Sequence, residues 1–162
     1  MGRVCATFAA LAALLAAAAP ASAAAAPREL WATVNVCDTP GHPDAIGIRG
    51  SMPGDGRGAV RMRMRFRLQY QAPSGPWRPL AAGDSGWVAV GSGRLRTGQA
   101  GQTFTITPPG AGRPYVLRGV VSFQWRRGRH VVARARRVTT AGHGATRGAD
   151  PAGFSAATCR IA

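Results

Sequence analysis

The chain has no lysine and very few acidic residues. All 21 basic residues are arginine, against six acidic ones, and the formal net charge is +15 at pH 7. Most of the arginines can therefore find no acidic partner within the chain. A charge surplus of this size produces a positive field that attracts anionic polymers, and salt screens that attraction.

The shortage of acids also argues against an enzyme. A glycosidase uses a pair of carboxylic acids, but no glutamate follows Glu29, and the five aspartates mostly stand beside glycine or proline, as turn residues do. The serines lie in no recognisable nucleophile motif. The sequence therefore predicts a non-enzymatic protein, without catalytic residues, cofactor or metal ion.

Long hydrophobic runs are missing except at the N-terminus. Arg3 precedes a stretch over residues 4–19 that is nearly all Ala, Leu and Val, and small residues follow it up to residue 26. This pattern is typical of a secretory signal peptide. Roughly 15 apolar residues are fewer than the ~20 of a membrane-spanning helix, which favours cleavage over a retained anchor. We expect residues 1–26 to be a signal peptide and residues 27–162 to be one secreted, extracellular domain.

Cysteine is scarce as well. Cys5 belongs to the predicted signal peptide, which leaves Cys37 and Cys159 as a pair in an exported chain. Such a pair predicts a disulfide, and two free thiols are the alternative. In the chain-entropy model, closing so long a loop contributes about 4 to 5 kcal/mol. A structural metal site would need more cysteine or histidine than the chain offers.

Beyond residue 26, short apolar runs alternate with turn residues, and no stretch keeps a helical period. This pattern predicts strands, with helices that are short at most. The expected strands are residues 30–36, 45–52, 60–71, 77–80, 87–90, 104–107, 115–125, 131–138 and 154–161. Residues 38–44 are expected to form a turn and residues 139–152 a loop.

The most regular pattern lies in residues 60–71. The alternating residues are Arg61, Arg63, Arg65 and Arg67 on one side and Met62, Met64, Phe66 and Leu68 on the other. A period of two predicts one long strand with the arginines on one face and the apolar side chains on the opposite face. Residues 115–138 are predicted to form a hairpin with its turn at residues 126–129.

Seven to nine short strands predict an all-β fold of two packed sheets. In strand number and spacing, residues 29–161 resemble an immunoglobulin-like or fibronectin type III-like domain of small secreted bacterial proteins. The resemblance implies an immunoglobulin-like sandwich and no particular binding site. The chain departs from immunoglobulin domains in its cysteines. Those domains pair cysteines on inner strands around a tryptophan, whereas Cys37 and Cys159 lie on the first and last predicted strands.

The arginine row is the candidate binding site. Alternate residues of a strand lie about 6.5 to 7 Å apart, and planar guanidinium groups suit phosphate and carboxylate. If the row and the predicted hairpin share a sheet, three further arginines widen it. The candidate anion-binding residues are then Arg61, Arg63, Arg65, Arg67, Arg118, Arg134 and Arg136. The expected partner is an anionic cell-envelope polymer or an acidic protein.

Alternative interpretations stay open. A composition rich in Arg, Ala and Gly is typical of a GC-rich genome, so the row can also be a solvated outer face of a structural or accessory protein without a ligand. Nucleic acid is disfavoured, because Phe66 and Tyr70 alternate away from the arginines and leave no stacking platform. Trp31 is expected in core packing, or else as an exposed aromatic.

One further loop contains residue types that bind cations. Asp38, His42 and Asp44 lie close together in the predicted turn at residues 38–44. Two prolines and a glycine in the same stretch favour a different explanation, in which the aspartates accept hydrogen bonds from local backbone N–H groups.

Overall fold

A computed structural model describes residues 29–72, 75–107 and 114–162, so the predicted signal peptide lies outside the described residues. Within these ranges the chain forms eight strands and no helix. The strands are β1 (Trp31–Thr39), β2 (His42–Pro53), β3 (Val60–Gln71), β4 (Trp77–Ser92), β5 (Thr97–Thr105), β6 (Tyr115–Arg127), β7 (His130–Val138) and β8 (Cys159–Ile161). The predicted all-β fold is confirmed.

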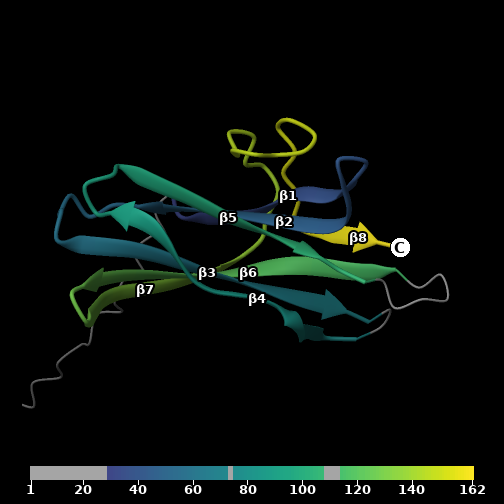
Figure 1. Cartoon of the computed structure of the whole chain (residues 1–162), viewed down its shortest axis with the longest axis horizontal. Coiled ribbons are helices and arrows are strands. Elements are labelled where there is room, and N and C mark those ends of the chain that lie inside the picture. The colour runs from purple at the N-terminus through teal and green to yellow at the C-terminus, as the bar shows by residue number, and fades with distance from the viewer. Residues whose placement is uncertain (1–28, 73–74, 108–113) are drawn as a thin grey trace, which may run out of the picture.

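The strands form two antiparallel sheets that lie face to face (Figure 1). One sheet has the order β1-β2-β5, and the other has the order β4-β3-β6-β7. The short strand β8 pairs with the beginning of β6, and β7 pairs with its later part. The two-sheet architecture expected from strand number and spacing is therefore present.

The core lies between the two sheets, and the alternation of β3 builds much of it. Met62, Met64, Phe66 and Leu68 are fully buried, whereas the arginines between them lie on the outer face. The opposite sheet contributes Val34, Ile46 and Ile48. Packing on one face thus fixes which side chains the sheet presents to solvent on the other.

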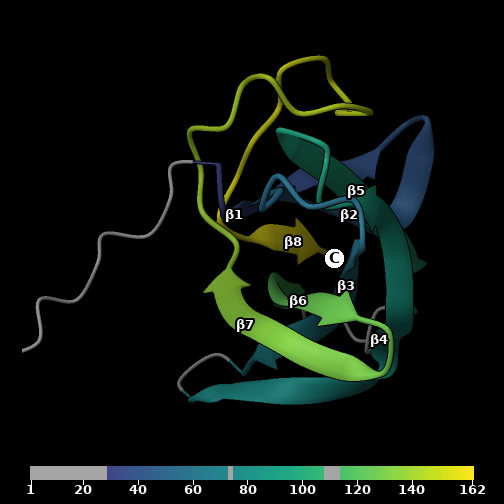
Figure 2. The ribbon, with the colours of Figure 1, turned by 90° about the vertical axis from the view of Figure 1, so that its left-hand side faces the viewer.

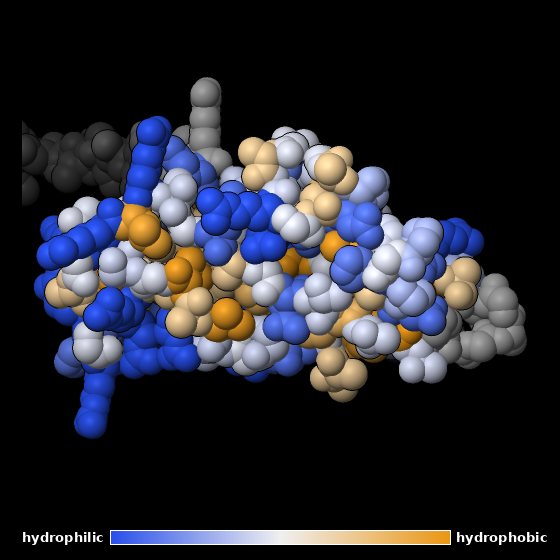
Figure 3. All heavy atoms as spheres, turned by 45° about the horizontal axis from the view of Figure 1, so that its top comes forward, coloured by the Kyte–Doolittle hydropathy of each residue, from blue (hydrophilic) through white to orange (hydrophobic). Residues whose placement is uncertain are grey.

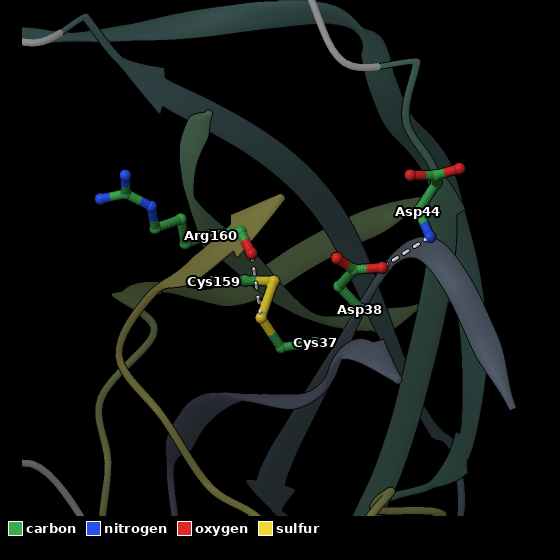
Figure 4. Close-up of a disulfide and its surroundings, with 5 residues drawn as sticks. All are labelled: Cys37, Asp38, Asp44, Cys159 and Arg160. Carbon is green, nitrogen blue, oxygen red and sulfur yellow. Dashed lines mark hydrogen bonds between the residues drawn. A yellow bond between two sulfur atoms is a disulfide. The ribbon is translucent and has the colours of Figure 1, made fainter. Parts of the chain in front are cut away.

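The β1–β2 connection is tighter than the predicted turn at residues 38–44. Thr39 pairs with His42, so Pro40 and Gly41 alone form the turn. Asp38 and Asp44 have positive φ angles of 45° and 54°, a conformation that aspartate tolerates better than most residues. The Asp38 carboxylate accepts a hydrogen bond from the Asp44 N–H at 2.9 Å (Figure 4). This contact is the local backbone role that the proline and glycine content favoured.

Four strand predictions were wrong in extent. Residues 77–80 and 87–90 belong to one strand, β4, because bulges absorb the residues between them and the Ser85 hydroxyl accepts the Phe66 N–H at 2.9 Å. The strand predicted at 104–107 begins at Thr97, since its glycines pair with β2. The last strand is limited to Cys159–Ile161, because Ala156 forms a bridge to Val34 of β1 instead.

The segment between β7 and β8 lies on the outer side of the β1-β2-β5 sheet (Figures 1 and 2). It contacts β1 through Thr33, whose hydroxyl lies 2.7 Å from that of Ser155, and through Asn35, which donates to the Gly148 carbonyl at 2.7 Å. Trp31 stacks on His143 at 4.6 Å between ring centroids. Trp31 thus packs neither in the core nor alone in solvent. This side of the molecule shows hydrophilic and hydrophobic side chains interspersed (Figure 3).

A disulfide links Cys37 of β1 to Cys159 of β8, with 5.4 Å between the Cα atoms (Figure 4). Because β8 pairs with β6, this bond joins the two sheets. The predicted disulfide is confirmed. A search of the described residues finds no helix long and apolar enough to cross a membrane.

Candidate anion-binding face

Cross-strand pairing gathers the predicted arginines on the outer face of the β4-β3-β6-β7 sheet. Arg61 lies opposite Arg126 of β6, and Gln69 lies opposite Arg118. On β7, Arg134 and Arg136 lie opposite Gln124 and Ser122 of β6, which in turn face Arg63 and Arg65 of β3. Directly opposed residues project from the same side of a sheet. We call this surface the arginine face: Arg61, Arg63, Arg65, Arg67, Arg118, Arg126, Arg134, Arg136 and Arg160.

All seven predicted residues belong to this face, together with two that the sequence prediction omitted. Arg126 was assigned to the hairpin turn, but β6 extends to Arg127 and keeps Arg126 in the ladder. Arg160 joins the face because β8 pairs with β6, which places it opposite Val116. The alternation of β6 already contained the signal for Arg126, whereas the pairing of β8 has no local sequence signal.

Arg65 is neutralised by Asp84, which among the described residues is the one acidic side chain on the face. Its Nε donates to Asp84 Oδ1 at 2.7 Å, and its Nη2 donates to Oδ2 at 2.5 Å. This bidentate contact lowers the pKa of Asp84 and raises that of Arg65. Arg65 is therefore less available to an external anion than its neighbours in the row.

The Arg65–Asp84 pair predicts a specific pH dependence. Because Asp84 has a lower pKa in the folded chain than its ordinary value of 3.8, the pair stabilises the fold above that pH, and this contribution disappears as the pH falls through the folded-state pKa. In thermal unfolding, wild type and Asp84→Asn should differ most at neutral pH and converge in acid. A difference that stays constant down to strongly acidic pH would contradict this role. The effect should be modest, because both side chains are partly exposed.

Four arginines line an open depression of about 730 Å³ at the β6–β7 end of the face. Its lining residues are Arg61, Arg63, Ala89, Gly91, Ser92, Arg126, Gly128 and Arg129. Arg126 donates from Nη2 to the Arg129 carbonyl at 2.8 Å, and its buried Nε finds no hydrogen-bond partner among the described residues. The depression contains cationic groups and small residues, and none of its lining residues is acidic.

The other end of the face holds Arg118 in a fixed position. Its guanidinium lies 4.2 Å from the centroid of the Trp77 ring, and its Nε donates to Gln69 Oε1 at 2.9 Å. Burial lowers the pKa of Arg118, and the positive charge of Arg136 lowers it further. A hollow of about 110 Å³ is lined in part by Gln69, Arg67 and Arg136.

Two tryptophans of β4 share the arginine face, which the sequence pattern did not predict. Trp87 lies opposite Arg65, and Trp77 lies opposite Gln71 of β3. Both are half-buried. Phe66 does point into the core, as expected, but the inference that the face has no aromatic side chain was wrong, because it considered β3 alone.

The charged residues outside the arginine face include both aspartates and further arginines. Among the described residues, Asp38, Asp44 and Asp150 lie at the β1–β2 hairpin, where Asp150 contacts His42 Nδ1 at 3.1 Å. The arginines outside the face are Arg49, Arg57, Arg78, Arg94, Arg96, Arg127, Arg129, Arg137 and Arg147. No group of three or more potential metal ligands occurs in the described part of the chain. Half of its arginines therefore share one sheet surface with a single acid.

The fold and this surface define a small all-β protein of two sheets, one of which has an arginine-rich outer face. Comparison of the chain with protein-family models, curated proteins and solved structures finds no match.

Proposed function

We propose that this protein is a secreted, non-enzymatic binding protein whose arginine face holds an anionic polymer of the cell envelope. The observation that carries the proposal is the asymmetry of the face, where nine arginines meet one aspartate and four arginines line an open depression. Guanidinium groups held on paired strands form a row that an extended anionic chain can follow. The signal-like N-terminus and the disulfide support export.

We also propose that the fold is an immunoglobulin-like sandwich. Its strand order supports this, since β1-β2-β5 corresponds to strands A-B-E of that fold and β3-β6-β7 corresponds to C-F-G. The fourth strand lies beside β3 rather than beside β5, and the disulfide joins β1 to β8. Loops at the ends of such sandwiches often bind ligands, but here the charge lies on a sheet surface.

A structural or accessory protein without a dedicated ligand is the second candidate. It is favoured by the nine arginines that lie elsewhere, which is the distribution expected if composition alone placed them. The two candidates differ in whether binding depends on the position of the arginines or only on their number.

The deciding experiment compares two variants with equal charge. One replaces Arg61, Arg67, Arg134 and Arg136 of the face by glutamine, which leaves the Arg65–Asp84 pair intact. The other replaces Arg57, Arg78, Arg96 and Arg147, which are exposed elsewhere. We expect wild type and the second variant to bind purified anionic envelope polymer, with affinity falling about 10- to 100-fold from 50 to 200 mM salt. The face variant should lose most of this binding. Equal losses in both variants would favour the second candidate.

A further inference from the structure

The positive charge of the arginine face is divided between its two ends. At the β6–β7 end, Arg61, Arg63 and Arg126 of the face and Arg129 of the adjoining turn line the large depression, which we call the turn subsite. At the opposite end, Arg67 and Arg136 line a small hollow together with Gln69, which accepts a hydrogen bond from Arg118, and we call these three arginines the clamp subsite. Along β3, about six residues separate the centres of the two, which corresponds to about 20 Å.

The surface between the subsites contains a paired arginine and a tryptophan. Arg65 lies there, but Asp84 binds it through both oxygens. Trp87 lies opposite Arg65 on β4, and Ser122 lies opposite it on β6. Arg63 reaches across to the Trp87 carbonyl at 3.3 Å and so borders this region. A ligand that crosses the middle of the face meets the half-buried Trp87 indole and the paired Arg65, with Arg67 donating to the Ser122 hydroxyl at 3.3 Å on the clamp side.

Neither subsite is lined by an acidic side chain. In the turn subsite, the hydrogen bond from Arg126 Nη2 to the Arg129 carbonyl holds the Arg126 guanidinium at the depression. In the clamp subsite, Trp77 and Gln69 hold the Arg118 guanidinium, and Gln69 lines the small hollow together with Arg67 and Arg136. No acidic residue lines this hollow, so a carboxylate, sulfate or phosphate there would have cationic neighbours and no anionic one. The orientation of Arg118 is already fixed, so less conformational entropy is lost on binding.

We propose that the face binds an acidic polysaccharide in extended form, with anionic groups in the turn and clamp subsites and a sugar ring against Trp87. This inference rests on the proposed function and specifies its ligand class. A ring-free polyanion such as polyphosphate can pair with both groups of arginines, but it gains nothing from the indole. A sugar chain presents the apolar face of a ring as well as charge, and an aromatic side chain recognises such a face.

The two-subsite arrangement also makes affinity depend on ligand length. A short oligosaccharide can occupy one subsite at a time, whereas a chain that spans about 20 Å converts the second contact into an intramolecular one. Linked contacts of this kind raise apparent affinity by roughly 10²- to 10⁴-fold. Charge density alone would instead produce a gradual increase with length.

The test uses oligogalacturonates of two and eight units and linear polyphosphates with matching numbers of charges. For wild type, we expect the longer oligogalacturonate to bind at least about 100-fold more tightly than the shorter one. Removing either subsite, with Arg61→Gln/Arg126→Gln or with Arg118→Gln/Arg136→Gln, should abolish most of this difference. Trp87→Ala should weaken oligogalacturonate binding by about 2- to 10-fold and leave polyphosphate unchanged, and Trp87→Phe should restore most of the loss.

The outcomes separate this inference from the proposed function. If Trp87→Ala weakens both polymers equally or neither of them, the polysaccharide assignment is wrong while anion binding stands. If both oligogalacturonate lengths bind equally, the two-subsite arrangement is wrong. If neither polymer binds wild type more tightly than the four-arginine face variant, both proposals are wrong. Thermal unfolding of every variant establishes that the fold is retained.

Discussion

Reduction of the Cys37–Cys159 disulfide should lower the free energy of unfolding by about 4 to 5 kcal/mol in the chain-entropy model. The two cysteines are 122 residues apart in sequence, so the bond closes a loop that contains nearly the whole fold. Since β8 has only three residues, the bond also anchors the last strand against β1. Chemical denaturation with and without reductant measures the change.

A double Cys37→Ser/Cys159→Ser variant is the control for side effects of the reductant. Its unfolding midpoint should match that of the reduced wild type and should not respond to reductant. Equal stability of the variant and the oxidised wild type would show that the bond does not constrain the fold.

Phe66→Ala should destabilise the protein by about 3 to 5 kcal/mol, the usual cost of deleting a large buried aromatic side chain. The Phe66 side chain is 0% exposed and lies on β3 between two arginines of the face. The cavity would therefore form directly beneath the arginine row. Equilibrium unfolding in urea measures the loss.

Phe66→Leu is the matched control, because it removes less volume from the same place. We expect it to cost clearly less than Phe66→Ala. If both variants keep wild-type stability, Phe66 does not pack between the sheets, and the orientation of the arginine row would have to be reassigned.

The buried side chains of β3 and the disulfide together determine how the arginine row is held. The arginine row faces outward because the alternate residues of β3 are committed to the core. The disulfide then fixes the β1-β2-β5 sheet against the sheet that displays the row. The guanidinium groups thus project from a rigid, paired backbone rather than from loops, which reduces the entropy lost on binding.

The parts of the fold with strong local patterns were predictable from the sequence. The alternation of residues 60–71 identified β3 and both of its faces, and the β6–β7 hairpin followed from alternating runs around Gly128. The cysteine pair was predictable because the N-terminal pattern predicts export, and two remaining cysteines in an exported chain favour a disulfide. The strand and the hairpin are determined by residues close together in sequence, and each of the two cysteines has only one possible partner.

The parts that depend on long-range pairing were not predictable. The glycines and Asp84 of β4 indicated a turn, but bulges against β3 keep them within one strand. Residues 154–158 have strand-like composition, yet their contact with β1 takes them out of the final strand. The burial of Thr33 and Asn35 depends on a segment more than 100 residues away.

The residues of the candidate site likewise divide into those that the sequence predicted and those that it missed. The seven predicted arginines were found from alternation and from the expectation that β3 and the hairpin share a sheet. Trp77, Trp87 and the Arg65–Asp84 pair were missed, since each depends on the bulged register between β3 and β4. The two tryptophans and the paired arginine of the face therefore become visible only in the three-dimensional structure.

The most direct test of the central claim is residue-resolved mapping of polymer binding by backbone amide NMR. A titration of the folded, disulfide-bonded protein with an acidic oligosaccharide should shift amide resonances of β3, β6 and β7 at near-stoichiometric ligand. Amides near Arg49 and Arg147, on the other side of the sandwich, should change little. If the shifts instead appear at arginines on both sides alike, binding follows charge alone and the arginine face is not a binding site.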